Sequence, residues 1–172
     1  MPVSWWDSLS AERKLDVVGA IMAAMGLLIG LVLFYSQRSV VTGSATIFLS
    51  QMLGWGVYVL PAGLFLMGVW LVARRIEKLP PLSLERAFGL ALFFFWLLAA
   101  MHSIVAPVEL AEEAALDGWG GGYIGSLFER LLFNSLGTAG AIVALLAWLL
   151  ITITMIFDIS VEDLFRWIAP LV

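Results

Sequence analysis

The 172-residue sequence is 62% hydrophobic and only 13% charged, and it has a formal net charge of −4 and no cysteine. A soluble globular domain is about 45–50% apolar and about 25% charged, so this composition excludes that class. The lack of cysteine excludes disulfides and thiolate chemistry, and the net negative charge provides no basic surface for nucleic acid. A histidine-based metal cluster would have to be shared between chains, because His102 is the one histidine.

Four long runs without Asp, Glu, Lys or Arg indicate a polytopic membrane protein: residues 17–37, 39–73, 87–108 and 131–157. Each run is long enough to cross a bilayer core of about 30 Å as a helix. We therefore predict an all-α membrane protein with four transmembrane helices at about residues 17–36, 55–73, 86–106 and 137–157. Residues 1–16 then form an interfacial lead-in, residues 17–157 the transmembrane domain, and residues 158–172 an amphipathic tail.

The first predicted span follows Ser10, a residue type that caps helix N-termini. Its small residues recur at spacings of four, three and four, so they share one helix face: Gly19, Ala23, Gly26 and Gly30. Such a face lets a neighbouring backbone approach closely, although glycine is also common in membrane helices without a packing role.

The second run is too long for one crossing, so we predict a break near Gly54, with a short interfacial helix at residues 46–53 before the span. Pro61 lies inside this span and removes one backbone hydrogen bond, which predicts a kink. A kink of this kind marks the binding site in some transporters, but without a nearby ionisable residue we interpret Pro61 as structural.

The third predicted span opens at Ser83 and Glu85, and His102 lies near its far end, either as a titrating or ligand-binding group or as a simple hydrogen-bonded residue. An acidic and then glycine-rich loop follows. Glu109 and Glu113 have the i,i+4 spacing of one helix face, which suits a cation or acid–base chemistry, although no partner base accompanies them. We interpret the loop as solvated and as a candidate surface for partners, with Glu109, Glu112, Glu113, Asp117 and Trp119 as its candidate residues.

The fourth predicted span repeats the second one at an offset of 83 residues: an amphipathic helix with one amide, then a glycine, then an apolar run. Ile124, Leu127, Phe128 and Leu131 form the apolar stripe of the short helix before it. The candidate packing residues of the span itself are Gly137, Gly140, Ala141 and Ala144.

The stretches from Gly54 to Gly68 and from Gly121 to Gly140 resemble the four-helix N-terminal membrane domain of the FtsK/SpoIIIE DNA translocases, with the glycine-glycine loop as the most specific part. The resemblance implies a domain in the bacterial inner membrane that anchors a DNA-pumping ATPase at the division septum and contacts other division proteins. It also implies a homo-oligomer, because the motor of the family works as a ring.

A full-length translocase also carries a linker, a motor with Walker motifs and a DNA-reading domain, and none of these occurs in the 172 residues. The chain is therefore either a portion of a longer protein, with the tail as the start of the linker, or a stand-alone relative. We expect no enzyme activity, no cofactor, no metal and no direct nucleic-acid binding. The alternatives are a small transporter or channel subunit and, less favoured, an intramembrane enzyme.

The positive residues are distributed unevenly among the loops, which predicts that both termini are cytoplasmic. Seven Lys or Arg residues lie on the side of the termini and two on the other side. The acidic loop then faces outward.

Overall fold

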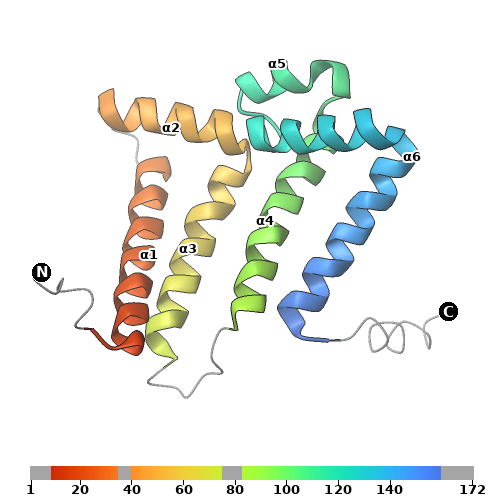
Figure 1. Cartoon of the computed structure of the whole chain (residues 1–172). Coiled ribbons are helices and arrows are strands. Elements are labelled where there is room, and N and C mark those ends of the chain that lie inside the picture. The colour runs from red at the N-terminus through yellow and green to blue at the C-terminus, as the bar shows by residue number, and fades with distance from the viewer. Residues whose placement is uncertain (1–8, 35–39, 75–82, 160–172) are drawn as a thin grey trace, which may run out of the picture. The chain divides into compact units, whose positions relative to one another are not determined.

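The computed structural model describes residues 9–34, 40–74 and 83–159, and every regular element among them is a helix (Figure 1). The elements are α1 (Ala11–Phe34), α2 (Val40–Leu53), α3 (Gly56–Ala73), α4 (Leu84–Val105), the 3-10 helix η1 (Val108–Leu110), α5 (Ala111–Leu116) and α6 (Gly122–Phe157). Four stretches are long and apolar enough to cross a membrane: Glu12–Phe34, Gly56–Ala73, Glu85–Val105 and Gly122–Phe157. The predicted all-α, four-span fold is confirmed.

Two helix starts are set by serine side chains. The Oγ of Ser10 accepts a hydrogen bond from the backbone N–H of Arg13 at 3.4 Å, and the Oγ of Ser83 accepts one from Arg86 at 3.2 Å. Each serine thereby satisfies one of the backbone donors left free at a helix N-terminus. Because the Ser10 cap starts α1 at Ala11, part of the predicted lead-in at residues 1–16 is already the first turns of α1.

The second predicted span is interrupted where the sequence analysis placed the break. Gly54 has a positive φ of 55° between α2 and α3, and α3 then continues from Gly56 through Pro61 to Ala73. The predicted interfacial helix was too short, because α2 begins at Val40 rather than near residue 46.

The last helix has two arms that meet at Gly137. This residue has φ 67° and ψ 175°, which lies outside the helical region. Only glycine adopts this combination of angles at little cost. The predicted short helix and the predicted span at residues 137–157 are thus the two arms of α6. The first arm lies across the C-terminal end of α4 and the second runs back beside α4 (Figure 1). The predicted tail at residues 158–172 lies, from residue 160 on, outside the described residues.

The chain divides into two compact units, one formed by Met1–Thr46 with Val57–Pro81 and one by Ile47–Gly56 with Leu82–Val172. The first unit contains the pair of α1 and α3. A Cβ added at Gly26 would lie 2.6 Å from the Pro61 carbonyl oxygen, and one at Gly19 would lie 2.9 Å from the Gly68 carbonyl oxygen. Glycine on α1 therefore allows the two backbones to approach closely, and Arg74 and Asp16 add an ion pair at 3.8 Å.

The second unit contains α4 with both arms of α6. Trp96 of α4 donates a hydrogen bond from its indole N–H to the Leu145 carbonyl at 2.8 Å. The Phe128 ring of the first arm meets the Trp148 ring of the second arm edge to face, with ring centroids 5.2 Å apart. These contacts hold the two arms of α6 at the angle that Gly137 permits.

Gly26→Ala should weaken the pair of α1 and α3, because the new methyl group would also lie 2.6 Å from the backbone nitrogen of Phe65. We expect the free energy of unfolding to fall by about 1–3 kcal/mol, the usual cost of overpacking. Gly63→Ala is the matched control, since a Cβ there meets nothing within 4 Å. Thermal unfolding in detergent measures both variants, and equal melting temperatures would contradict the close approach.

Candidate functional site

The second unit contains a compact segment, residues 106–121, which we call the cap. It comprises Ala106, Pro107, η1, α5 and the glycine-rich loop that leads into α6. Ala106 is extended, with φ −134° and ψ 143°, because the residue before a proline is disfavoured in the helical region. α4 therefore ends at Val105, and the chain turns back over its end.

His102 joins this cap to α4. Its side chain is fully buried, and its Nδ1 accepts a hydrogen bond from the backbone N–H of Gly121 at 3.3 Å. Because Nδ1 accepts, the proton of a neutral ring is on Nε2, which donates to the Ala111 carbonyl at 2.9 Å. One neutral imidazole thus satisfies a backbone group at the start of α5 and another at the end of the glycine-rich loop.

Glu129, from the first arm of α6, lies beside the same ring. Its Oε2 is 3.7 Å from Nε2 of His102, and the residue is only 1% exposed. Within the described residues 9–34, 40–74 and 83–159, this oxygen has no hydrogen-bond partner. An ion pair forms across this distance only if the ring is protonated. The arrangement therefore brings two ionisable groups from α4 and α6 together beneath the cap, where water does not reach either.

The glycine-rich loop fits between the end of α4 and the turn that joins α2 to α3. Gly121 lies against the Leu98 carbonyl so closely that any side chain would collide with it. On the other side, the Trp55 N–H donates to the Gly120 carbonyl at 2.7 Å, and the Gln51 side-chain amide donates to the Leu116 carbonyl at 3.2 Å. The loop is thus held by close backbone contacts on both sides, and the Gln51 side chain holds the end of α5 just before it.

The five acidic and aromatic residues predicted for the partner surface all lie exposed in the cap: Glu109, Glu112, Glu113, Asp117 and Trp119. Glu112 forms an ion pair with Arg130 of α6 at 3.2 Å. The interpretation of Glu109 and Glu113 as one helix face was wrong. Glu109 belongs to η1 and Glu113 to α5, and the backbone of Leu110 between them is not helical, with φ −104° and ψ 4°.

The packing residues predicted for the first two spans lie at or near close approaches. Within the first unit, Gly19 and Ala23 lie against Gly68, and Gly26 lies against Pro61. Gly30 makes only an ordinary contact with Pro61, because an added Cβ would be 3.8 Å from the proline Cβ. In the second unit, Gly54 lies against the backbone of Gly120 and Gly122.

The packing face predicted for the last span needs correction. A Cβ at Gly137 would meet nothing within 4 Å, because this glycine serves the break in α6 rather than a contact. A Cβ at Gly140 would meet only Leu136 of the same helix, and Ala144 is half-buried. Ala141, which the predicted face includes, is fully buried, as is Thr152 further along this arm.

Sequence reasoning missed Glu129 altogether. Next to Arg130 it looks like one half of a solvated charge pair, yet Arg130 pairs with Glu112 instead. One signal was available: Gly122, Gly125, Ser126 and Glu129 are spaced three, one and three residues apart, which is one helix face, and all four are buried. Among the described residues, no group of three or more His, Cys, Asp or Glu is placed to hold a metal ion.

Fold and site together define a multi-pass helical membrane domain that carries a compact cap fastened by buried polar contacts. The family model described as the 4TM region of DNA translocase FtsK/SpoIIIE matches residues 42–169, and the chain belongs to this family. It is also 26% identical over 168 residues to the DNA translocase FtsK of Caldanaerobacter subterraneus subsp. tengcongensis. That match covers 93% of this chain and 23% of the relative. No solved structure matches the chain.

The chain thus spans about a quarter of the length of the curated relative that it matches. The matched family region is the membrane region, and the 172 residues contain no Gly-x-x-x-x-Gly-Lys-Ser/Thr motif. These 172 residues therefore correspond to the membrane region and do not include the ATPase motor of a translocase.

Replacing His102 by leucine should destabilise the second unit, because it leaves the Gly121 N–H and the Ala111 carbonyl buried without their partner. We expect a loss of about 2–6 kcal/mol in the free energy of unfolding, since each of the two groups costs about 1–3 kcal/mol. Ser103→Ala is the control on the same helix turn, because that hydroxyl bonds only within α4. Thermal or denaturant unfolding in detergent is the measurement.

A double variant tests whether His102 and Glu129 act as a pair. If they do, His102→Leu combined with Glu129→Gln costs less than the sum of the single changes. If the two changes in the free energy of unfolding add, the His102 ring stabilises the second unit only through its hydrogen bonds to the cap.

Proposed function

We propose that the chain is the membrane-anchoring and interaction domain of an FtsK-like DNA translocase that acts in cell division and chromosome segregation. The observation that carries this proposal is the family match over residues 42–169, together with the four helices that can cross a membrane. The cap supports the interaction part, since its exposed acidic and aromatic side chains are held on a firmly fastened backbone. Direct binding of nucleic acid is not proposed for this acidic segment.

We further propose that the chain lies in the bacterial inner membrane with both termini in the cytoplasm. The support is the distribution of positive charge, which is concentrated on cytoplasmic loops in membrane proteins. The side of the termini carries Arg13, Lys14, Arg74, Arg75, Lys78, Arg86 and Arg166, whereas the other side carries Arg38 and Arg130. The cap then lies on the outer side.

Single-cysteine labelling tests this topology without background, because the chain has no cysteine of its own. Glu85 and Glu113 are both exposed and lie near opposite ends of α4, about 33 Å of helix apart. In intact spheroplasts, a membrane-impermeant maleimide should label Glu113→Cys but not Glu85→Cys. Labelling of Glu113→Cys only after the inner face is opened would reverse the proposed topology.

Oligomerisation and partners follow from the same proposal. A motor that works as a ring brings several copies of its membrane domain together, so we propose a homo-oligomer. The cap and the lipid-exposed helix faces are the surfaces available for contact with further copies and with membrane proteins of the division septum.

A transporter or channel subunit is the second candidate, and the buried pair of His102 and Glu129 is the observation that favours it. Ionisable residues inside membrane helices often belong to proton or ion pathways. The pair lies beneath the cap at one end of α4, and both nitrogens of the ring are bonded to cap backbone. This placement fits the anchor better, because a pathway needs polar groups along the whole span.

A fluorescent protein fused after Val172 should concentrate at the division septum of growing cells and fractionate with the inner membrane. An even distribution around the cell would contradict the proposed role in division. The same fluorescent protein fused to an unrelated four-span membrane protein is the control, because extra membrane at the septum would raise its signal there as well.

Reconstitution in liposomes separates the anchor from the transporter. The purified chain should give no saturable ion or solute flux above that of empty liposomes. Saturable flux that is lost in Glu129→Gln would establish the transporter instead.

A further inference from the structure

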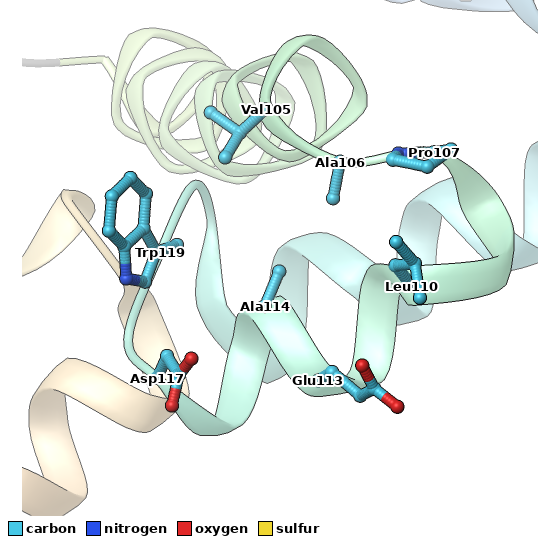
Figure 2. A pocket seen from close by; sticks show the side chains of 8 residues that line it. All are labelled: Val105, Ala106, Pro107, Leu110, Glu113, Ala114, Asp117 and Trp119. Atoms are coloured by element: carbon cyan, nitrogen blue, oxygen red, sulfur yellow. The ribbon is translucent and has the colours of Figure 1, made fainter.

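A cavity of about 290 Å³ lies between the cap and the end of α4 (Figure 2). Its apolar walls come from Val105, Leu110 and Ala114, and the Trp119 ring stands at one side of it, opposite Leu110. Glu113 and Asp117 lie at its edge on the α5 side, with their carboxylates directed away from the apolar interior. The volume is at the lower end of ligand clefts, which are about 300–1,000 Å³, so it suits one or two side chains.

The residues around this cavity carry a net negative charge. The cap carries four carboxylates and no lysine or arginine, and the nearby Arg130 is engaged by Glu112. No hydrogen bond or ion pair is formed by the Glu113 or Asp117 carboxylates within the part of the chain that the structure describes. Such a field attracts cationic groups and repels anionic ones, including anionic lipid headgroups.

The rim of the cavity also exposes apolar surface. The Leu110 side chain is 49% exposed and the Trp119 side chain 53% exposed, although both are large. The indole face of tryptophan is the best aromatic acceptor for a lysine or arginine side chain. The cavity therefore offers an apolar pocket and a cation site side by side.

The backbone that carries the cavity is already ordered. Ala111 and Gly121, between which α5 and Trp119 lie, are both fixed by the buried His102 ring. A partner therefore does not bear the cost of ordering a loop when it binds.

We propose that this cavity binds a short basic and apolar segment of a partner protein. An apolar side chain of the segment enters between Leu110 and Trp119, and a neighbouring lysine or arginine lies against Glu113 and Asp117. The inference deepens the proposed function, on which it rests, by naming the kind of partner that the cap recognises.

The test uses the whole chain in nanodiscs of zwitterionic phosphatidylcholine, in which both membrane faces are accessible. The probe is a short fluorescent peptide that alternates lysine or arginine with leucine. We expect saturable binding that weakens about tenfold when serine replaces the leucines and disappears when glutamate replaces the basic residues. Empty nanodiscs give the background.

Cavity variants decide where the peptide binds. Ala114→Phe fills the cavity without changing charge and should weaken binding at least about tenfold, whereas Leu116→Phe, an exposed position on α5 that does not line the cavity, should leave it unchanged. If Ala114→Phe lowers the melting temperature, Trp119→Ala takes its place and should give the same loss.

Charge variants decide whether the carboxylates at the rim take part. Glu113→Lys and Asp117→Lys should each weaken binding about threefold, within the range of exposed ion pairs. Both effects should exceed that of Glu109→Lys, which reverses the same charge at a cap residue that does not line the cavity. Equal effects of all three would reduce the interaction to general attraction and overturn the site.

Absence of saturable peptide binding, or unchanged binding in Ala114→Phe and Trp119→Ala, would overturn the proposal. Phospholipid that copurifies with the chain and is lost in Ala114→Phe would assign the cavity to a lipid and also overturn it. Because both faces of a nanodisc are open, these outcomes do not depend on the topology or on localisation at the septum.

Discussion

The constraint on which the structure depends is that a lipid-facing helix gains nothing by burying its apolar side chains. Lipid tails are as apolar as leucine, so helices associate through close packing and polar contacts instead. Both units follow this rule with different residues. In the first unit, Gly26 of α1 lies against Pro61 of α3, and in the second Gly121 lies against the Leu98 carbonyl. The large apolar side chains of α1, such as Leu28 and Leu31, are exposed.

In the first arm of α6, the same constraint leaves apolar side chains exposed and buries small and polar residues. In a soluble protein, the stripe of Ile124, Leu127, Phe128 and Leu131 would face the core. Here Leu127 and Leu131 are each 59% exposed, and the buried face is made of Gly122, Gly125, Ser126 and Glu129. The small and polar face turns toward α4 and the cap because its glycines allow a close approach to the backbone of Leu98. The exposed Leu127 and Leu131 on the other face are suited to lipid.

The sequence predicts local features of this fold well and distant pairings poorly. Charge-free runs locate the four spans, serine locates the starts of α1 and α4, and Gly54 is a recognisable break, because each depends on residues close in the chain. The contact between His102 and Glu129 depends on the path of the cap between them. That path is set by Pro107 and by the close approach of Gly121 to Leu98, and no spacing rule reports it. The acidic cap residues were predicted as exposed for the simple reason that carboxylates without partners stay in water.

The hydrogen bonds of the His102 ring also explain why a polar group lies in such a buried place. An apolar side chain at this position would fill the same space but leave the Ala111 carbonyl and the Gly121 N–H without partners. With the ring present, the two ends of the segment that carries α5 and Trp119 are tied to one residue of α4, and Glu129 of α6 lies against that residue. A force applied to the cap is therefore passed to the spanning helices through short bonds rather than through a loose loop.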